Sequence, residues 1–164
     1  MELTHVDAAG AARMVDVSDK SPGARVAVAA GELHTTAEVI ELLRRDGLPK
    51  GDALATARIA GIMGAKRTPE LVPLCHPIAL TGVTVELALP ADSPDGTAEP
   101  TVRITATVKT TDRTGVEMEA LTAVAVAGLA LHDMVKAVDP AAVLDGVRVL
   151  RKDGGKTGHW ERPA

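Results

Sequence analysis

The stretch TGVTVELAL, residues 81–89, decides the fold, because apolar and polar residues alternate along it. Such alternation is typical of a strand with one buried face, and the strand is predicted to begin near residue 78. A second alternating stretch, residues 102–108, follows an exposed connection rich in proline, aspartate and glycine at residues 90–100. We therefore predict two neighbouring strands that pair in antiparallel fashion.

Helix signals lie on both sides of this strand pair. Residues 35–38 read Thr-Thr-Ala-Glu, which is an N-cap signature, and Gly47-Leu48-Pro49 ends the helix that follows. The remaining predicted elements are strands over 12–17 and 25–30, a helix over 52–66, a helix over 117–138 and a strand over 143–150. Short strand connections and helices grouped in blocks predict an α+β fold, an antiparallel sheet with helices packed on one face.

The composition is that of a globular chain with an unusual core. Its 164 residues predict a single domain over residues 1–164. A folded monomer of 16.9 kDa should expose about 7,700 Å². There is no Phe or Tyr, and Trp160 is the only aromatic residue. Small aliphatic side chains must therefore fill the core, and they leave flat apolar faces that suit self-association.

Composition also excludes several classes of function. A net charge of -4 and one aromatic residue argue against a nucleic-acid binder, which needs basic surface and stacking rings. A lone cysteine, Cys75, fits a reducing compartment. Residues 1–5 show no targeting pattern. The most apolar stretch, residues 120–131, is shorter than the roughly 20 residues that span a bilayer. We expect a cytoplasmic protein without nucleic-acid or membrane partners.

One candidate reactive segment is Leu74-Cys75-His76-Pro77, which Pro73 also precedes. The prolines restrict the backbone on both sides, so the thiol and imidazole are held rigidly. Neighbouring side chains on an extended segment face opposite ways, which argues against a Cys75–His76 nucleophile and base pair. Histidine exchanges protons near neutral pH, so His76 is the better candidate. Cys75 remains open between a buried structural thiol and a site residue.

A second candidate is the end of the long predicted helix, where Asp133 and Lys136 are three residues apart and share one face. A surface ion pair is the simpler interpretation. The preceding helix is almost wholly apolar, however, so we expect burial on several sides, which makes a charged pair costly unless it has a function. Lys50, just before the helix at 52–66, is a candidate anion ligand, and Arg58 could add a fork for phosphate. Asp52 is predicted simply to cap that helix.

Helix geometry separates two of the acidic candidates. Glu119 and Asp133 are 14 residues apart, so they lie on nearly the same face but about 21 Å from each other along the axis. One small pocket in a single chain cannot use both. If both are functional, an antiparallel neighbour must bring them together. The glycine-rich basic tail, residues 152–158, could lie against phosphates, and the five histidines and one cysteine form no zinc spacing.

Taken together and in order, these segments resemble the molybdenum cofactor biosynthesis protein C family, the cyclic pyranopterin monophosphate synthases. The matching stretches are Leu3-Thr4-His5-Val6-Asp7, Met14-Val15-Asp16-Val17-Ser18, Lys50-Gly51-Asp52, Ala55-Thr56-Ala57-Arg58-Ile59-Ala60-Gly61, Pro73-Leu74-Cys75-His76-Pro77, residues 114–121, Asp133-Met134-Val135-Lys136-Ala137-Val138 and Gly154-Gly155-Lys156. Each stretch is modest alone, but the ordered set is highly specific.

The resemblance implies a ferredoxin-like subunit in a homohexamer, a trimer of dimers with sites at the interfaces. It implies conversion of (8S)-3',8-cyclo-7,8-dihydroguanosine 5'-triphosphate to cyclic pyranopterin monophosphate with release of diphosphate. No resident cofactor or metal is implied, although Mg²⁺ can accompany the triphosphate. The alternatives are a non-catalytic oligomer that binds a nucleotide or pterin, and a purely structural assembly subunit with surface ion pairs.

The resemblance also assigns roles to residues. The implied catalytic residues are Asp133, Lys136 and Lys50, and His76 joins them as the proton-exchange candidate of the sequence. The implied substrate-binding residues are Leu74, Cys75, His76, Met118 and Glu119, with Arg25, Lys152 and Lys156 in less secure phosphate-binding roles. His132 stands where many relatives carry an aromatic residue, and it receives no role.

Overall fold

The computed structural model describes residues 5–92 and 98–163, so the middle of the predicted connection at residues 90–100 lies outside the described residues. The elements in chain order are β1 (Gly23–His34), α1 (Ala37–Arg44), α2 (Ala53–Lys66), α3 (Thr68–Leu71), β2 (Leu80–Ala88), β3 (Thr101–Asp112), α4 (Glu117–Val135), β4 (Val143–Asp153) and β5 (Trp160–Glu161).

The five strands form one sheet in the order β2-β3-β1-β4-β5, and every neighbouring pair is antiparallel. The alternating stretches quoted first are β2 and β3, which pair from Leu80 with Thr110 to Ala88 with Arg103. Without β5, the order of elements and strands is the ferredoxin-like β-α-β-β-α-β arrangement. The predicted fold class is therefore confirmed.

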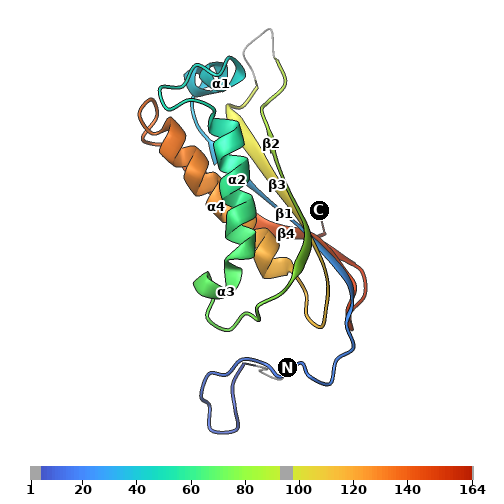
Figure 1. The fold of residues 1–164 in the computed structure, drawn as a ribbon. Helices are drawn as coiled ribbons and strands as arrows, with labels where there is room; N and C mark the ends of the chain where they lie inside the picture. Colours follow the sequence, from blue (N-terminus) through green and yellow to red (C-terminus); the bar gives the residue numbers. More distant parts are fainter. Residues whose placement is uncertain (1–4, 93–97, 164) are drawn as a thin grey trace.

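Helices α2 and α4 lie on one side of this sheet and pack against each other (Figure 1). α4 contacts β1, β3 and β4, while α2 lies over β2. The contact is built from small residues because the chain has no Phe or Tyr. The buried small residues of the two helices are Ala53, Ala57, Gly61, Gly64 and Ala65 on α2 and Ala120, Ala123, Ala127 and Gly128 on α4.

Local signals explain where the helices begin. Thr36 accepts a hydrogen bond from the backbone N–H of Val39 at 3.3 Å, and the Asp52 carboxylate accepts one from Ala55 at 2.9 Å. Both caps were predicted. Among the described helices, α4 is long and apolar enough to cross a membrane, but half of its apolar window is buried inside the protein. That burial against α2 and the sheet is the arrangement of a core helix.

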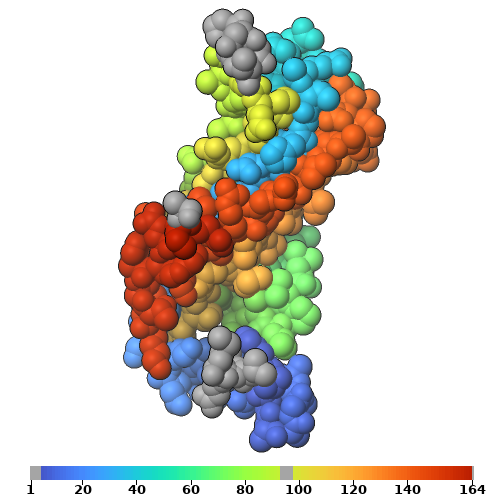
Figure 2. Space-filling view, turned by 180° about the vertical axis from the view of Figure 1, so that it is seen from behind, coloured from blue at the N-terminus to red at the C-terminus, as the bar shows by residue number. Residues whose placement is uncertain are grey.

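The prediction of a strand over 12–17 is wrong. Ala12 makes an isolated bridge to Val6, and residues 13–17 pair with no strand among the described residues. The cause is a local turn, because the Asp7 carboxylate accepts hydrogen bonds from the backbone of Ala9 and Ala11. Residues 5–22 form an arm at one end of the molecule, dark blue in Figure 2. The short elements α3 and β5 were not predicted.

We expect Gly61→Ala to destabilise the protein by about 1–3 kcal/mol, because overpacking a tight contact outweighs the gain in helix propensity. A Cβ at this position would lie 2.9 Å from the Ala123 carbonyl oxygen and 3.1 Å from the Ala127 Cβ. Urea unfolding measures the effect. Gly23→Ala is the matched control, since a Cβ there meets nothing within 4 Å. Equal stability of the two variants would contradict a backbone contact between α2 and α4.

Candidate active site

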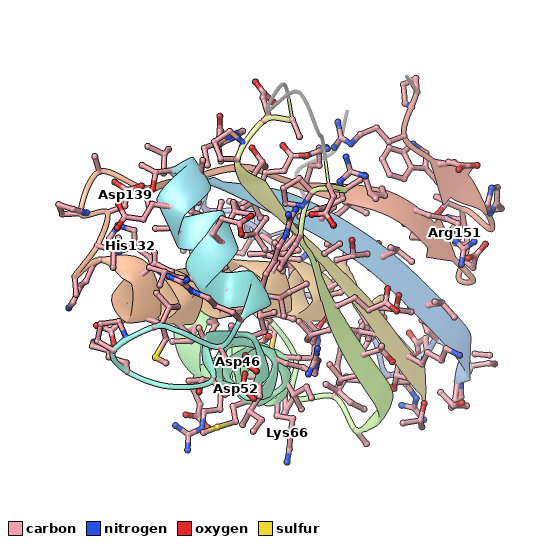
Figure 3. All side chains as sticks on the ribbon, turned by 90° about the horizontal axis from the view of Figure 1, so that it is seen from above. Asp46, Asp52, Lys66, His132, Asp139 and Arg151 are labelled. Atoms are coloured by element: carbon pink, nitrogen blue, oxygen red, sulfur yellow. The ribbon has the colours of Figure 1, made fainter. Side chains whose placement is uncertain are left out.

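The predicted site residues gather in two groups at opposite ends of α4. Lys50, Asp133 and Lys136 lie at its C-terminal end. The remaining predicted residues lie at its N-terminal end, around two adjoining cavities. In Figure 3, His132, which precedes Asp133, and Arg151, which precedes Lys152, stand at opposite ends of the molecule.

Asp133 sits between two lysines at the end of α4. Its Oδ1 lies 2.7 Å from the Lys136 Nζ, and its Oδ2 lies 2.8 Å from the Lys50 Nζ. Lys50 comes from the loop before α2, and it also donates to the Asp133 carbonyl at 2.9 Å. That carbonyl is one of the four at a helix C-terminus that lack an intrahelical partner, and a cation is favoured there.

The two ammonium groups hold the Asp133 carboxyl in its charged form. The hydrogen bond from Lys136, followed by that from Lys50, lowers the pKa of Asp133 to about 2. The carboxylate is therefore anionic near neutral pH, and it can orient a lysine rather than donate a proton.

The expected burial of this group is wrong. Leu131, Met134 and Val135 turn the apolar side of the helix end inward. Asp133 and Lys136 face outward, with side chains 54% and 53% exposed. The apolar run therefore indicates burial of the helix but not of its polar stripe. Arg58 is not part of this group, since its Nε donates to the Val85 carbonyl on strand β2 at 3.2 Å.

The N-terminal end of α4 borders a cavity of about 430 Å³. Its lining includes all five positions that the resemblance implies for substrate contact, namely Leu74, Cys75, His76, Met118 and Glu119. The loop before β2 supplies the first three, and the first turn of α4 supplies the other two.

Glu119 is the least satisfied polar group in this cavity. The residue is 2% exposed, and its Oε2 has no hydrogen-bond partner among the described residues. Burial, and to a smaller extent the neighbouring Glu117, raises the pKa of Glu119. Burial and the Glu119 charge likewise raise the pKa of Cys75, so the thiol is not activated as a nucleophile. An unpaired buried carboxyl group costs stability, which is typical of a site kept for a ligand.

Arg25, Lys152 and Lys156 line a second, smaller cavity of about 110 Å³. Gly115 and Glu117 line both cavities, so the two adjoin. The backbone of the glycine-rich loop lies close to Arg25. A Cβ on Gly155 would overlap the Arg25 guanidinium, so only glycine fits beside this side chain as it is placed. Strand β5 follows the loop and pairs Trp160 with Lys152.

Existing contacts hold two of these basic side chains in place. Arg25 donates to the carbonyl oxygens of Asp112 and Arg113 at 2.9 and 3.1 Å. Lys152 pairs with Glu117 at 3.1 Å. The structure thus brings the three predicted phosphate-binding residues together beside the larger cavity, in a place that suits an anionic part of a ligand.

Sequence reasoning missed the contribution of the N-terminal arm to this cavity. Val15, Val17 and Lys20 line it, and the Val15 carbonyl oxygen lies 2.7 Å from His76 Nε2. The available signal was the family match at Met14–Ser18, to which no role was given. Within residues 5–92 and 98–163, no three His, Cys, Asp or Glu side chains are grouped to hold a metal ion.

We expect Glu119→Gln to stabilise the folded protein at about pH 8 but not at about pH 4. The pKa of Glu119 is higher in the folded protein than in the unfolded chain. The stability contributed by its neutral carboxyl group is therefore present at low pH and is lost as pH rises through the folded-state pKa. Glutamine keeps the shape and cannot ionise. The melting temperature at both pH values checks the prediction, with exposed Glu86→Gln as the control. A lower melting temperature for Glu119→Gln at the higher pH would contradict it.

Comparison with known proteins identifies the family of this chain. The family model described as "MoaC family" matches residues 14–155. The chain is 64% identical to cyclic pyranopterin monophosphate synthase of Streptomyces griseus over 99% of this chain and 87% of the relative. It is 62% identical to the protein of that name from a Nocardioides species, over 98% and 96% of the two chains. It is 58% identical to cyclic pyranopterin monophosphate synthase 2 of Mycobacterium tuberculosis, over 98% and 92%. The chain therefore belongs to the MoaC family, the family that its ordered motifs predicted.

Proposed function

We propose that this chain is an enzyme that forms cyclic pyranopterin monophosphate from (8S)-3',8-cyclo-7,8-dihydroguanosine 5'-triphosphate, with release of diphosphate, in molybdenum cofactor biosynthesis. The observation that carries the proposal is the cavity at the N-terminal end of α4, where a buried carboxyl group and an imidazole adjoin a cluster of basic residues. Such a site suits a ligand with a polar ring system and a chain of phosphates. The family and the names of the relatives support the same reaction.

The basic cluster is proposed to bind the triphosphate. Arg25, Lys152 and Lys156 supply positive charge, and the loop with Gly154 and Gly155 brings the backbone close to the same place. Preorganised cations stabilise the negative charge that develops as diphosphate leaves. The cavity beside it would hold the ring system against Leu74, Cys75, His76, Met118 and Glu119.

We propose that proton transfer depends on Lys136. Asp133 stays ionised and orients the Lys136 ammonium at 2.7 Å, and it holds Lys50 on its other oxygen. Lys136 would donate and recover protons as the purine-derived ring opens and the pyranopterin forms, with assistance from Lys50 and His76. The contacts of Asp133 support an orienting role for it, since its charged form is the stable one.

The two groups can act together only if two copies of the chain share each site. The continuous helix α4 keeps Glu119 and Asp133 about 21 Å apart along its axis. We propose a homohexamer, a trimer of dimers, in which an antiparallel neighbour supplies the second group. The chain exposes 9555 Å², which is more than the roughly 7,700 Å² expected of a monomer of this mass. Exposed apolar side chains on α2 and α4, Ile59, Met63 and Leu129, support such contacts.

The compartment and the cofactor requirement of the enzyme complete the proposal. We propose that the enzyme is cytoplasmic and uses no resident cofactor, and that any Mg²⁺ enters with the triphosphate as part of the substrate. The alternative, an oligomer that binds a nucleotide or pterin without turnover, predicts affinity for the cyclic nucleotide but no products.

Turnover separates these two functions. Purified protein is incubated with the cyclic nucleotide, diphosphate is measured, and the pterin is detected by fluorescence after oxidation. We expect both products from the wild type. Lys136→Ala should lower kcat by roughly 10²–10⁴-fold, the range for loss of a general acid or base. Lys66→Ala, an exposed lysine in the last turn of α2, is the matched control. Normal turnover by a correctly folded Lys136→Ala variant would exclude the role.

A mixing experiment tests whether two chains share a site. Asp133→Asn and Glu119→Gln subunits, each inactive alone, are unfolded, mixed in equal amounts and refolded. Random pairing should restore about a quarter of wild-type activity, because some interfaces combine an intact residue from each chain. Asp133→Asn mixed with Lys136→Ala is the control, since both lesions lie on the same end of α4 and no interface can become intact. Equal recovery in the two mixtures would rule out the shared site.

A further inference from the structure

The N-terminal arm, residues 5–22, is attached to the rest of the chain at few points. Most of its hydrogen bonds are internal, such as those of Asp7 with Ala9 and Ala11 and that of Asp16 with Ser18. Among the described residues, two hydrogen bonds join residues 5–20 to the body of the protein. Arg113 donates to the Ser18 carbonyl at 3.2 Å, and His76 Nε2 lies 2.7 Å from the Val15 carbonyl oxygen.

The second of these contacts determines where the proton of His76 resides. A carbonyl oxygen can only accept a hydrogen bond, so Nε2 must be the nitrogen that carries hydrogen. A neutral imidazole has one N–H and one lone-pair nitrogen, and the partner of one nitrogen sets the state of the other. Nδ1 is therefore the lone-pair nitrogen, and it has no hydrogen-bond partner among the described residues.

The residue that carries this lone-pair nitrogen lines the larger cavity. His76, Cys75 and Glu119 all line it, together with Val15 and Val17 of the arm. Burial raises the pKa of Cys75 and of Glu119. Val15 of the arm thus has two roles. It lines the cavity, and its carbonyl oxygen holds the His76 ring.

We propose that the backbone carbonyl of Val15 is a positioning group for the reaction, which holds His76 as the Nε2–H tautomer so that Nδ1 takes up the substrate proton. This inference rests on the proposed function. In the step, the bond between hydrogen and the substrate breaks, its electron pair stays on the substrate, and the proton bonds to Nδ1. The ring becomes an imidazolium whose Nε2–H still donates to Val15, a hydrogen bond that strengthens with the charge. The proton later returns from Nδ1 to the substrate or to water.

The tautomer can be measured without any substrate. Full-length protein with ¹⁵N-labelled histidine is studied by NMR, where couplings to the carbon-bound ring protons distinguish the N–H nitrogen from the lone-pair nitrogen. His76→Gln identifies the signals of His76 by their loss. We expect the Nε2–H form of the neutral ring in the wild type. An Nδ1–H form would overturn the inference whatever the enzyme turns over.

Two further variants connect the tautomer with the reaction. His76→Gln keeps an N–H that can reach the Val15 carbonyl but removes the base, so kcat should fall by roughly 10²–10⁴-fold. Arg113→Ala removes the other contact of the arm. It should increase the Nδ1–H share of His76 and lower kcat by roughly 3- to 30-fold, because small misplacements of a catalytic group are costly. Arg103→Ala, near the opposite end of β3 from Arg113 and bonded to no described residue of the arm, is the control and should leave both readouts unchanged.

The outcomes separate the two proposals. If the wild type forms no pterin, the proposed function fails, and the NMR result alone still decides the tautomer. If Arg113→Ala alters the tautomer but leaves kcat at the wild-type value, the Val15 carbonyl has no part in positioning a catalytic base. A KM that rises while kcat stays unchanged would assign the arm to substrate binding only and would equally overturn the inference.

Discussion

The close contact between α2 and α4 is the constraint on which the rest of the structure depends. Gly61 lies against the backbone of Ala123, and Gly64 lies against Val126. With no large aromatic side chains available, two helices lined by small residues can pack onto the sheet at short range. The site residues on α4 itself, at both of its ends, take their positions from this contact, because α4 runs along it as one continuous helix.

The two ends of α4 differ in their electrostatics, and each suits a different task. At the C-terminal end, a fully ionised Asp133 holds two lysines in exposed positions. At the N-terminal end, Glu119 is buried and its pKa is raised. One end therefore presents ordered positive charge at the surface, and the other combines a cavity that holds a buried carboxyl group with a basic cluster beside it. In the proposed reaction the first end would transfer protons, and the second would bind the ring system and the phosphates.

Much of the fold could be predicted from local patterns. Alternation located β2 and β3, and the caps at Thr36 and Asp52 located α1 and α2. The separation of Glu119 from Asp133 followed from helix geometry alone. What local patterns could not supply were contacts between distant segments. Residues 12–17 of the arm alternate like a strand, yet within the described part of the chain no strand pairs with them. Val15 instead contacts a histidine that lies 61 residues away in the chain.

The single tryptophan has a practical consequence for work on this protein. Trp160 lies on β5, paired in register with Lys152, and the Arg162 guanidinium stands 5.9 Å from the centre of its ring. Since the chain contains no tyrosine, its intrinsic ultraviolet emission arises from this one indole. That indole is 38% exposed and adjoins the strand that leads into the glycine-rich loop. The molecule therefore carries a natural optical reporter beside its basic cluster, and no dye is needed to observe events there.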